Sequence, residues 1–412
     1  MTIEPSAPEA AVLPPEFFND PGENRHADLA ALRAQCPVHK INHPPGAEAY
    51  IVVDYATVSA AFSDPRLSKR TDNAPEWFRA LLADSSPVLT KNMLVADPPE
   101  HTRLRKLVAK AFTPRRMELL RPRVQEITDE LIDALPATGP VNLVSEFAFA
   151  LPMRVICEFL GVPLADRPRL HEWGTLLSGA PYPDEETNLR LKWASEQIES
   201  YLKEQIAARR TEPGEDLVSA LVRAADEDDV FSDDELVSTL VLLIIAGHKT
   251  TANLIGNGTE ALLRHPDQLE LLRTRPELAP TAIEEFLRFE APVFRGTLRV
   301  AAEDMQIAGV DIPKEAFVHL MMTSANRDPE QFEDPDRLDI SRSPNRHLSF
   351  GHGAHFCAGA PLSRVEGQIA FTTLLRRLPG LRLAEPPKWL YDNSTSRGLS
   401  ELLVSYDEKL PR

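Results

Sequence analysis

A single cysteine, Cys357, lies in the segment FGHGAHFCAG at residues 350–359, among glycines, histidines and phenylalanines. A cysteine thiolate is a strong ligand for transition metals, and a lone sulfur ligand leaves the opposite face of the metal open to another molecule. The glycines allow the backbone to approach a bound group closely. The segment therefore predicts a metal or cofactor site with one sulfur ligand.

Two other interpretations of Cys357 stay open on these residues alone. A buried cysteine usually packs as a small apolar side chain and has no chemistry. His352, His355 and Cys357 also suggest a zinc cluster, but it lacks a fourth ligand at a familiar spacing, and Cys36 and Cys157 are distant in the sequence. The choice depends on whether the rest of the chain supplies a cofactor pocket.

A helix long enough to cross a whole domain is predicted between Ser232 and Pro266. Ser232 and Glu235 have the spacing of a capping box. No proline follows before Pro266, which allows about 30 residues and about 45 Å of helix. The middle of this helix, residues 246–251, has glycine, lysine and two threonines where leucine would pack best. Threonine hydroxyls bond back to helix carbonyls and open a bend, so this departure from good packing predicts a functional site.

Positive charge is concentrated at residues 101–123 of a chain whose net charge is −17. One acid, Glu118, stands there among basic residues Arg103, Arg105, Lys106, Lys110, Arg115, Arg116, Arg121 and Arg123. Three interpretations of this run are open: a solvated helix face, a binding site for an anionic cofactor, or a surface that steers an acidic protein partner. The acidic balance of the whole chain argues against general nucleic-acid binding.

The remaining pattern predicts a mainly helical fold with small β-sheets. Residues 124–230 are predicted to be helical throughout, and strands are expected at residues 49–53, 299–304, 305–310 and 316–321. Residues 70–94 are expected to form an irregular, apolar-rich loop that is either a pocket wall or a surface loop. The break at residues 176–184 is expected to be a flap or an ordinary helix connection.

Composition predicts one cytoplasmic domain over residues 1–412, with residues 1–20 as a flexible tail. No linker or repeat divides the chain, and three cysteines suit a reducing compartment. The N-terminus lacks the pattern of a signal peptide. The longest aliphatic run, residues 240–246, is far shorter than the roughly 20 residues that span a bilayer, so no membrane is expected.

Together these segments resemble a bacterial cytochrome P450 over nearly the whole chain, in the order of that family. The residues that carry the resemblance are Phe350, Gly353, Cys357 and Gly359 for the F-x-x-G-x-x-x-C-x-G signature, Ala246, Gly247 and Thr250 for the oxygen-activation bend, and Glu285, Arg288 and Arg337 for the family's structural trio. The resemblance implies the cytochrome P450 fold, a single domain with the long central helix over the haem.

The resemblance also implies a cofactor, haem b, with Cys357 as the axial ligand of the iron. The other cofactor-binding residues that it implies are His101, Arg105, Ala246, Gly247, Arg299, Phe350, His355 and Gly359. Four of these, His101, Arg105, Arg299 and His355, match positions that bind the haem propionates. Such a role explains separate basic groups in an acidic chain, because two buried carboxylates need charge-assisted partners.

The activity implied by the resemblance is insertion of one oxygen atom from dioxygen into a bulky, mostly apolar molecule such as a macrolide, steroid or peptide-like secondary metabolite. Thr250 is expected to hold a water or hydroperoxide by its hydroxyl. The residues expected to line the substrate pocket, each of which is equally well explained as ordinary core, are Trp77, Met93, Leu94, Leu243, Ala246, Phe294 and Thr395. Electrons are expected from a separate ferredoxin and NAD(P)H-dependent ferredoxin reductase, because the chain has no segment left for a flavin or nicotinamide.

Lys249 departs from the family pattern, which has Asp or Glu beside the threonine. An ammonium group has three donors and no acceptor, so it does not relay protons as a carboxylate does. Three interpretations are open: a salt bridge on the helix flank, a contact with an acidic group of the substrate, or unusual chemistry such as oxidative coupling. A haem-binding recruitment or sensing module without catalysis is the rival function, which Lys249 favours and Thr250 opposes.

Overall fold

A computed structural model describes residues 25–43, 47–82, 86–177, 185–228, 232–390 and 395–412. The expected tail at residues 1–20 and most of the expected break at 176–184 lie outside the described residues. The helices are α1 (Arg25–Gln35), α2 (Tyr55–Phe62), α3 (Glu76–Leu82), α4 (Glu100–Ala111), α5 (Pro114–Leu119), α6 (Arg121–Ala134), α7 (Ala150–Leu160), α8 (Arg167–Leu177), α9 (Glu185–Thr211), α10 (Leu217–Asp228), α11 (Asp233–Arg264), α12 (Pro266–Thr274), α13 (Ala279–Phe289), α14 (Met322–Ala325) and α15 (Ala360–Arg377). The strands are β1 (Val38–Asn42), β2 (Glu48–Val52), β3 (Leu67–Ser68), β4 (Val141–Asn142), β5 (Val300–Ala301), β6 (Met305–Ile307), β7 (Val310–Ile312), β8 (Phe317–Leu320), β9 (Arg382–Leu383), β10 (Lys388–Leu390), β11 (Gly398–Glu401) and β12 (Leu403–Ser405).

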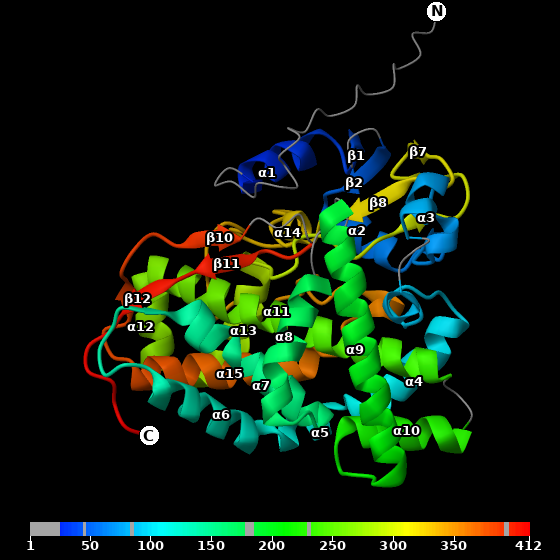
Figure 1. Cartoon of the computed structure of the whole chain (residues 1–412). Helices are drawn as coiled ribbons and strands as arrows, with labels where there is room; N and C mark the ends of the chain where they lie inside the picture. The colour runs from blue at the N-terminus through cyan, green and yellow to red at the C-terminus, as the bar shows by residue number, and fades with distance from the viewer. Residues whose placement is uncertain (1–24, 44–46, 83–85, 178–184, 229–231, 391–394) are drawn as a thin grey trace, which may run out of the picture.

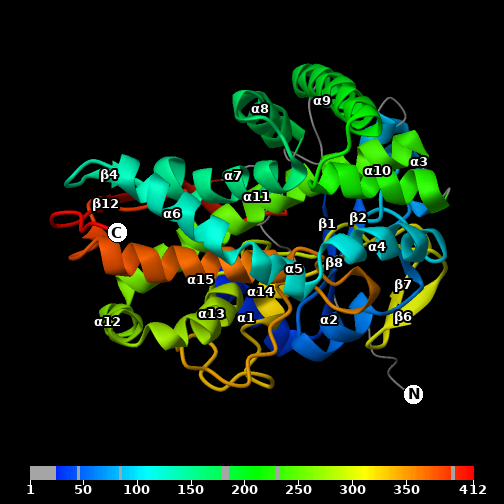
Figure 2. The ribbon, with the colours of Figure 1, turned by 90° about the horizontal axis from the view of Figure 1, so that it is seen from below.

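Helix α11 runs through the centre of the helical part, between α7 on one side and α13 and α15 on the other (Figures 1 and 2). It begins after Ser232, whose side chain accepts a hydrogen bond from the Glu235 backbone N–H while the Glu235 side chain bonds back, so the predicted capping box is confirmed. The helix is long and apolar enough to cross a membrane, but 78% of its most apolar stretch is buried inside the protein, as expected of a core helix.

A five-stranded sheet with the order β1-β2-β8-β5-β3 packs beside the helical part. Strands β1 and β2 form an antiparallel hairpin, and β2 pairs with β8 in parallel, with Tyr50 opposite Val318. The strand expected at 299–304 is only two residues long in the structure, as β5. The strand expected at 305–310 ends early, because Ala308 and Gly309 both have positive φ and turn the chain back into the β6–β7 hairpin.

The expected irregular loop at residues 70–94 contains a helix, α3, which the sequence analysis missed. Trp77 packs edge-on against Phe317 of β8 at a ring distance of 5.8 Å, and Phe78 is buried against the same ring. This segment is therefore attached to the sheet through its aromatic residues. Within residues 124–177 and 185–228 the chain is almost entirely helical, as predicted, apart from connections and the two-residue strand β4.

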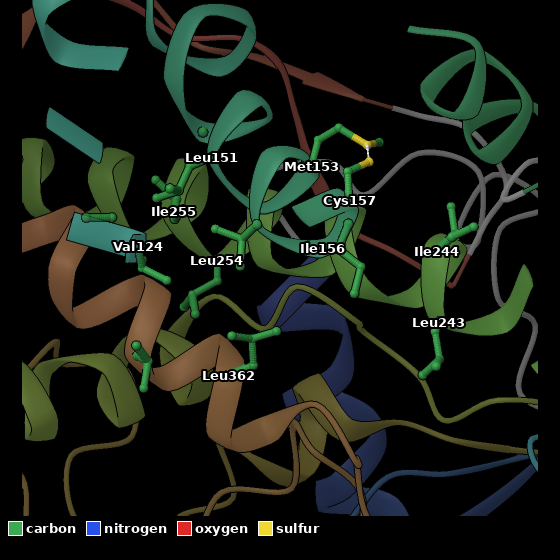
Figure 3. Packing of buried hydrophobic residues seen from close by; sticks show 14 of the residues in the cluster. Val124, Leu151, Met153, Ile156, Cys157, Leu243, Ile244, Leu254, Ile255 and Leu362 are labelled. Atoms are coloured by element: carbon green, nitrogen blue, oxygen red, sulfur yellow. Dashed lines mark hydrogen bonds between the residues drawn. The ribbon is translucent and has the colours of Figure 1, made fainter. Parts of the chain in front are cut away.

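The main apolar core joins residues from Val88 to Tyr406, and it surrounds α11. Leu243 and Ile244 leave α11 on opposite sides, while Ile156 of α7 and Leu362 of α15 approach α11 from different elements (Figure 3). Adding a Cβ at Gly247 would place it 3.0 Å from Cγ1 of Ile156. Glycine at position 247 therefore allows α7 to pack closely against the middle of α11.

Candidate active site

The loop that carries Cys357 is fixed by its own backbone and by α2. The Cys357 N–H donates to the Phe350 carbonyl at 2.9 Å, and the Phe356 N–H donates to the Gly353 carbonyl at 3.1 Å. Gly353 has a φ of +71°, and a Cβ there would lie 2.8 Å from Oγ of Ser63 just after α2. Only glycine fits both demands, so the glycine spacing in the sequence reflects a tight turn pressed against α2.

The sulfur of Cys357 faces a cavity and lies at the beginning of α15. Cys357 is exposed to the cavity, yet the surrounding protein atoms partly desolvate its thiol and raise its pKa. Backbone N–H groups of Gly359 and Ala360 and the positive charge of Arg105 act in the opposite direction and favour the thiolate. A bound cation would also favour the thiolate, so this sulfur is a suitable metal ligand.

Helix α11 forms another wall of the same cavity, separate from the cysteine loop. Ala246, Gly247, Thr250 and Thr251 all line the cavity. Thr250 Oγ1 donates to the Ala246 carbonyl at 2.9 Å, which is the back-bonding expected from the sequence. The hydroxyl oxygen keeps its acceptor lone pairs, so Thr250 offers a hydrogen-bond acceptor in a largely apolar wall.

The cavity has a volume of about 280 Å³ and is lined mostly by apolar side chains. The structure brings together most of the predicted site residues in its lining, namely Met93, Leu94, Arg105, Leu243, Ala246, Gly247, Thr250, Arg299, Phe350, His355, Cys357 and Gly359. Additional lining residues that the sequence analysis did not name include Phe112, Ile156, Val293, Thr297 and Glu366.

Three residues that were expected in the substrate pocket do not line this cavity. Trp77 is 41% exposed and packs on Phe78 and Phe317. Phe294 is buried in a separate core cluster, with the Arg25 guanidinium 4.9 Å from its ring. Thr395 accepts the Phe294 N–H through its backbone carbonyl at 3.0 Å. The sequence does not show which way an apolar side chain points. In the structure, Trp77 and Phe294 pack on the sheet side of the molecule.

One edge of the cavity collects basic side chains from distant segments. His101 and His355 stack with ring centroids 4.0 Å apart, and Arg105 donates to the Phe356 carbonyl. Arg299 donates to the Leu67 and Phe62 carbonyls, both at 3.3 Å. Lys69, which the sequence analysis missed, is buried and donates to Thr297 Oγ1.

These basic groups are poorly compensated within the protein. Burial lowers the pKa of Arg299 to about 10, and burial with the nearby positive groups lowers that of His355 to about 2. Burial also holds the pKa of Lys69 well below its usual value, with Asp97 opposing the shift. Buried Nε2 of His101 and Nε of Arg299 lack partners among the described residues. The edge therefore suits a ligand that brings negative charge and hydrogen-bond acceptors.

The comparisons with known proteins agree with this site. The family model described as Cytochrome P450 matches residues 176–380. Cytochrome P450 107B1 of Saccharopolyspora erythraea is 45% identical over 93% of this chain and 95% of its own length. Cytochrome P450 monooxygenase PikC of Streptomyces venezuelae is 43% identical over 98% of this chain and 95% of its own. The solved structure of CxnD, a cytochrome P450 for C–S bond formation in chuangxinmycin biosynthesis, has 54% identity and a TM-score of 0.93 over 97% of this chain and 98% of that one. The chain belongs to the cytochrome P450 family.

This cytochrome P450 is a monooxygenase of the group that tailors bacterial secondary metabolites, and its cofactor is haem b. The donor set fits the cofactor, because haem has two propionate carboxylates and the cavity edge has buried basic groups short of acids. Cys357 at the cavity wall offers the sulfur ligand. When bound, haem supplies the activation of dioxygen, which amino-acid side chains do not perform themselves.

The zinc interpretation finds no support in the structure. Across the described ranges, no group of three or more His, Cys, Asp or Glu side chains is arranged to hold a metal ion. His355 stacks on His101 at the basic edge. His352 is exposed.

The family's structural trio is present, but one of its members differs from the prediction. Glu285 and Arg288 are fully buried, with Nε–Oε2 and Nη2–Oε1 distances of 2.8 Å. Arg337 was expected to join them, yet its side chain is exposed and only its backbone carbonyl accepts from Arg288 at 3.1 Å. Arg342 takes the predicted place, with its Nε 3.2 Å from Oε2 of Glu285. The prediction of Arg337 was wrong by five residues because the chain path after residue 335 decides which arginine reaches the carboxylate.

The trio also connects α13 with the cysteine loop. Arg288 donates to the carbonyls of Asn326 and Pro335 at 3.0 and 2.7 Å. The Asn326 side chain in turn accepts the Leu348 N–H at 2.7 Å and donates to Ser349 Oγ at 2.8 Å. Since Leu348 and Ser349 lead directly into the loop, the buried ion pair sets the loop position through two hydrogen-bonded steps.

Lys249 is buried and does not line the cavity. Its neighbour His248 is fully buried, with Nδ1 2.6 Å from the Ile244 carbonyl. Burial lowers the pKa of His248 to about 4, and the positive charge of Lys249 contributes to this shift. The Lys249 residue is therefore largely covered by its neighbours without lining the cavity, and the acid that the family usually has at this position is missing.

Proposed function

We propose that this P450 inserts one oxygen atom from dioxygen into a C–H bond or double bond of a bulky, mostly apolar secondary metabolite of the macrolide, steroid or peptide-like kind. In this proposal Cys357 is the axial haem ligand and Thr250 holds the oxygen-side hydrogen bond. His101, Arg105, Arg299, His355 and Lys69 hold the propionates. We also propose that the whole chain acts as one domain in the cytoplasm.

The observation that supports the proposal best is the shared cavity. Cys357 and Thr250 line the same space, and the rest of its lining is dominated by apolar side chains such as Leu94, Leu243 and Val293. An apolar lining with a few placed polar groups suits binding of an apolar molecule against the reactive centre. Leu243 and Met93 come from different segments, so both contribute to the shape that a substrate must match.

The test is a screen of secondary metabolites for the optical shift produced when a bound molecule displaces water from ferric haem. A molecule that produces the shift is then incubated with a surrogate ferredoxin, its reductase and NADPH. A product with one added oxygen atom supports the proposal. Binding without any product, although the ferredoxin reduces the haem, favours the rival function of a haem protein that recruits or senses without turnover.

A second candidate is oxidative C–S bond formation, and a specific observation favours it. CxnD, whose described role is C–S bond formation, is 54% identical to this chain. The absence of a proton-relaying acid at Lys249 fits a coupling reaction, which has less need for that relay. The two candidates give different products from a thiol-bearing substrate. Coupling removes two hydrogen atoms and closes a ring, whereas monooxygenation adds an oxygen atom.

We further propose that a ferredoxin docks on the surface formed by Lys106, Arg115, Arg116, Leu119 and Phe356, here called the proximal surface. Leu119 is 73% and Phe356 40% exposed, and Phe356 directly precedes Cys357. The three basic residues are exposed, and among the described residues no ion pair joins them to an acid. Arg103, Arg121 and Arg123 of the same run are instead paired with Glu235, Glu118 and Glu158.

Neutralising this surface is expected to weaken reduction of the haem without changing the haem site. The triple variant Lys106→Gln, Arg115→Gln, Arg116→Gln should raise the KM for ferredoxin about tenfold at low salt, because it removes the charges that steer an acidic partner. The difference should disappear at high salt, where charges are screened. Arg275→Gln, which removes an exposed charge after α12, is the matched control. An unchanged KM and salt dependence in the triple variant would reject this docking surface.

A further inference from the structure

Arg364 of α15 and Glu284 of α13 form an ion pair beside the cysteine loop. Nε and Nη2 of Arg364 donate to Oε1 and Oε2 of Glu284, both at 2.7 Å. The two side chains are 33% and 24% exposed, so solvent screens the pair only in part. A guanidinium that binds both oxygens of one carboxylate is fixed in direction as well as in position. The positive charge of Arg364 therefore has a defined place in the fold.

A third donor holds the carboxylate of this pair. The Ser349 N–H donates to Nδ1 of His347 at 3.2 Å, so the Nε2–H of that ring is left to donate to Oε2 of Glu284 at 3.1 Å. Burial acts to raise the pKa of Glu284, but the bonds from Arg364 and His347 outweigh it and lower this pKa to about 2. Glu284 is therefore ionised at neutral pH and keeps the guanidinium in its place.

The guanidinium of Arg364 lies over the cysteine loop. Its central carbon is 4.7 Å from the centroid of the Phe350 ring. The Phe350 carbonyl accepts the Cys357 N–H at 2.9 Å, so the residue beneath the guanidinium also holds the backbone of the cysteine. Desolvation raises the pKa of the Cys357 thiol, and the side-chain charges that act most strongly against this shift are those of Arg105 and Arg364. The arginine end of the ion pair therefore acts on the sulfur.

A fixed charge at this place affects how readily a haem bound to the sulfur accepts an electron. Reduction of ferric haem adds one negative charge to a centre that already carries a thiolate. A positive charge nearby stabilises the reduced form more than the oxidised form and so raises the reduction potential. The carboxylate of Glu284 has the opposite sign and reduces this effect of Arg364.

We propose that Arg364, held in place by Glu284, sets the reduction potential of the haem through its positive charge. This inference rests on the proposed ligation of the haem iron by Cys357. Arg364 does not line the cavity, so it acts through Cys357 and is a positioning residue, not a catalytic one. The step concerned is the transfer of one electron from an external reductant to ferric haem, with no bond broken.

The experiment is a spectroelectrochemical titration of the substrate-free holoenzyme with dithionite and mediator dyes. Arg364→Gln removes the charge and should lower the midpoint by about 59 mV, which is a tenfold change in a one-electron equilibrium. Glu284→Gln removes the opposing charge and should raise the midpoint. Arg364→Lys keeps the charge and should retain most of the wild-type value. Arg376→Gln, which removes an exposed charge near the end of α15, is the matched control and should not change the midpoint.

The opposite signs of the two expected shifts separate an effect of charge from an effect of structure. If the pair only joins α15 to α13, both glutamine variants break the same bonds, and their midpoints should move in the same direction or not at all. Either result would overturn the proposal, and so would a full loss of potential in Arg364→Lys. If Arg364→Gln does not hold haem, Glu284→Gln decides: a midpoint above that of the wild type supports the proposal, and one at or below it overturns it.

The reduced carbonyl spectrum of the same samples distinguishes this inference from the proposed function. A wild-type protein without the red-shifted Soret band of a thiolate-bound haem would contradict ligation by Cys357 and, with it, the role of Arg364. A wild-type protein with that band, together with variants of unchanged midpoint, would overturn the role of Arg364 alone. Dithionite and the dyes need no protein partner, so a part of Arg364 in ferredoxin docking would not change these results.

Discussion

Replacing Glu285 with glutamine is expected to destabilise the folded protein by about 3–5 kcal/mol, which is a large part of the stability of an ordinary domain. Both charges of the Glu285–Arg288 pair are fully buried, so the variant leaves an uncompensated guanidinium in the interior. Glu285 also accepts hydrogen bonds from the Asp339 N–H at 2.9 Å and from Asn345 at 3.0 Å. The substitution therefore disturbs several contacts at once.

The measurement is chemical unfolding of purified protein together with its haem content. We expect a lower midpoint and loss of haem, because the Glu285 network sets the position of the cysteine loop through Asn326. Glu277→Gln is the matched control, since its pair with Arg275 is exposed at the surface. A Glu285→Gln variant with the midpoint and haem content of the wild type would refute the structural role assigned to this pair.

Replacing Lys69 with methionine is expected to have opposite effects on the haem-free and haem-bound protein. Without haem, burial disfavours the charged form of Lys69, so methionine of similar length should stabilise the fold. With haem, the variant would remove the charge-assisted hydrogen bond that we propose between Lys69 and a propionate, and the affinity for haem should fall about tenfold to hundredfold. Thermal unfolding of haem-free protein and haem transfer to an acceptor protein measure the two effects separately. Lys314→Met, at an exposed turn, should change neither.

The depressed pKa of Lys69 also predicts how the stabilisation of the haem-free protein by Lys69→Met depends on pH. Between the folded-state pKa and 10.5, the unfolded chain binds a proton that the folded haem-free protein does not, so wild-type stability rises with pH in that window. The stability gained by Lys69→Met should therefore shrink as the pH rises toward 10.5. A gain that grows with pH, or a haem affinity equal to that of the wild type, would contradict the role of Lys69 at the basic edge.

The features that the sequence predicted well depend on local chemistry. The capping box at Ser232 and the lack of proline before Pro266 determine helix α11 almost to the residue. The positive φ of Gly351 and Gly353 explains why glycines stand at those positions of the cysteine loop. Thr250 bonds back to Ala246 as its position in the helix interior predicts.

The features that the sequence analysis missed depend on the path of the chain through space. Arg337 and Arg342 are both arginines after α13, and only the folded course of residues 335–342 brings Arg342 to Glu285. Lys69 and Glu366 belong to no motif, and only the structure shows that both are buried, Lys69 bonded to Thr297 and Glu366 in the cavity wall. Glu366 is the only acid in α15, but the helix also contains arginines, and the sequence does not show that the Glu366 side chain is buried.

We propose that the Cys357 thiolate binds the haem iron at the wall of the cavity facing Thr250. The most direct test is the optical spectrum of the reduced carbonyl complex of the wild type and of Cys357→Ser. We predict that the wild type has the strongly red-shifted Soret band of a thiolate-bound haem and that the variant does not. A wild-type protein that holds no porphyrin, or a variant that keeps the red-shifted band, would contradict the account.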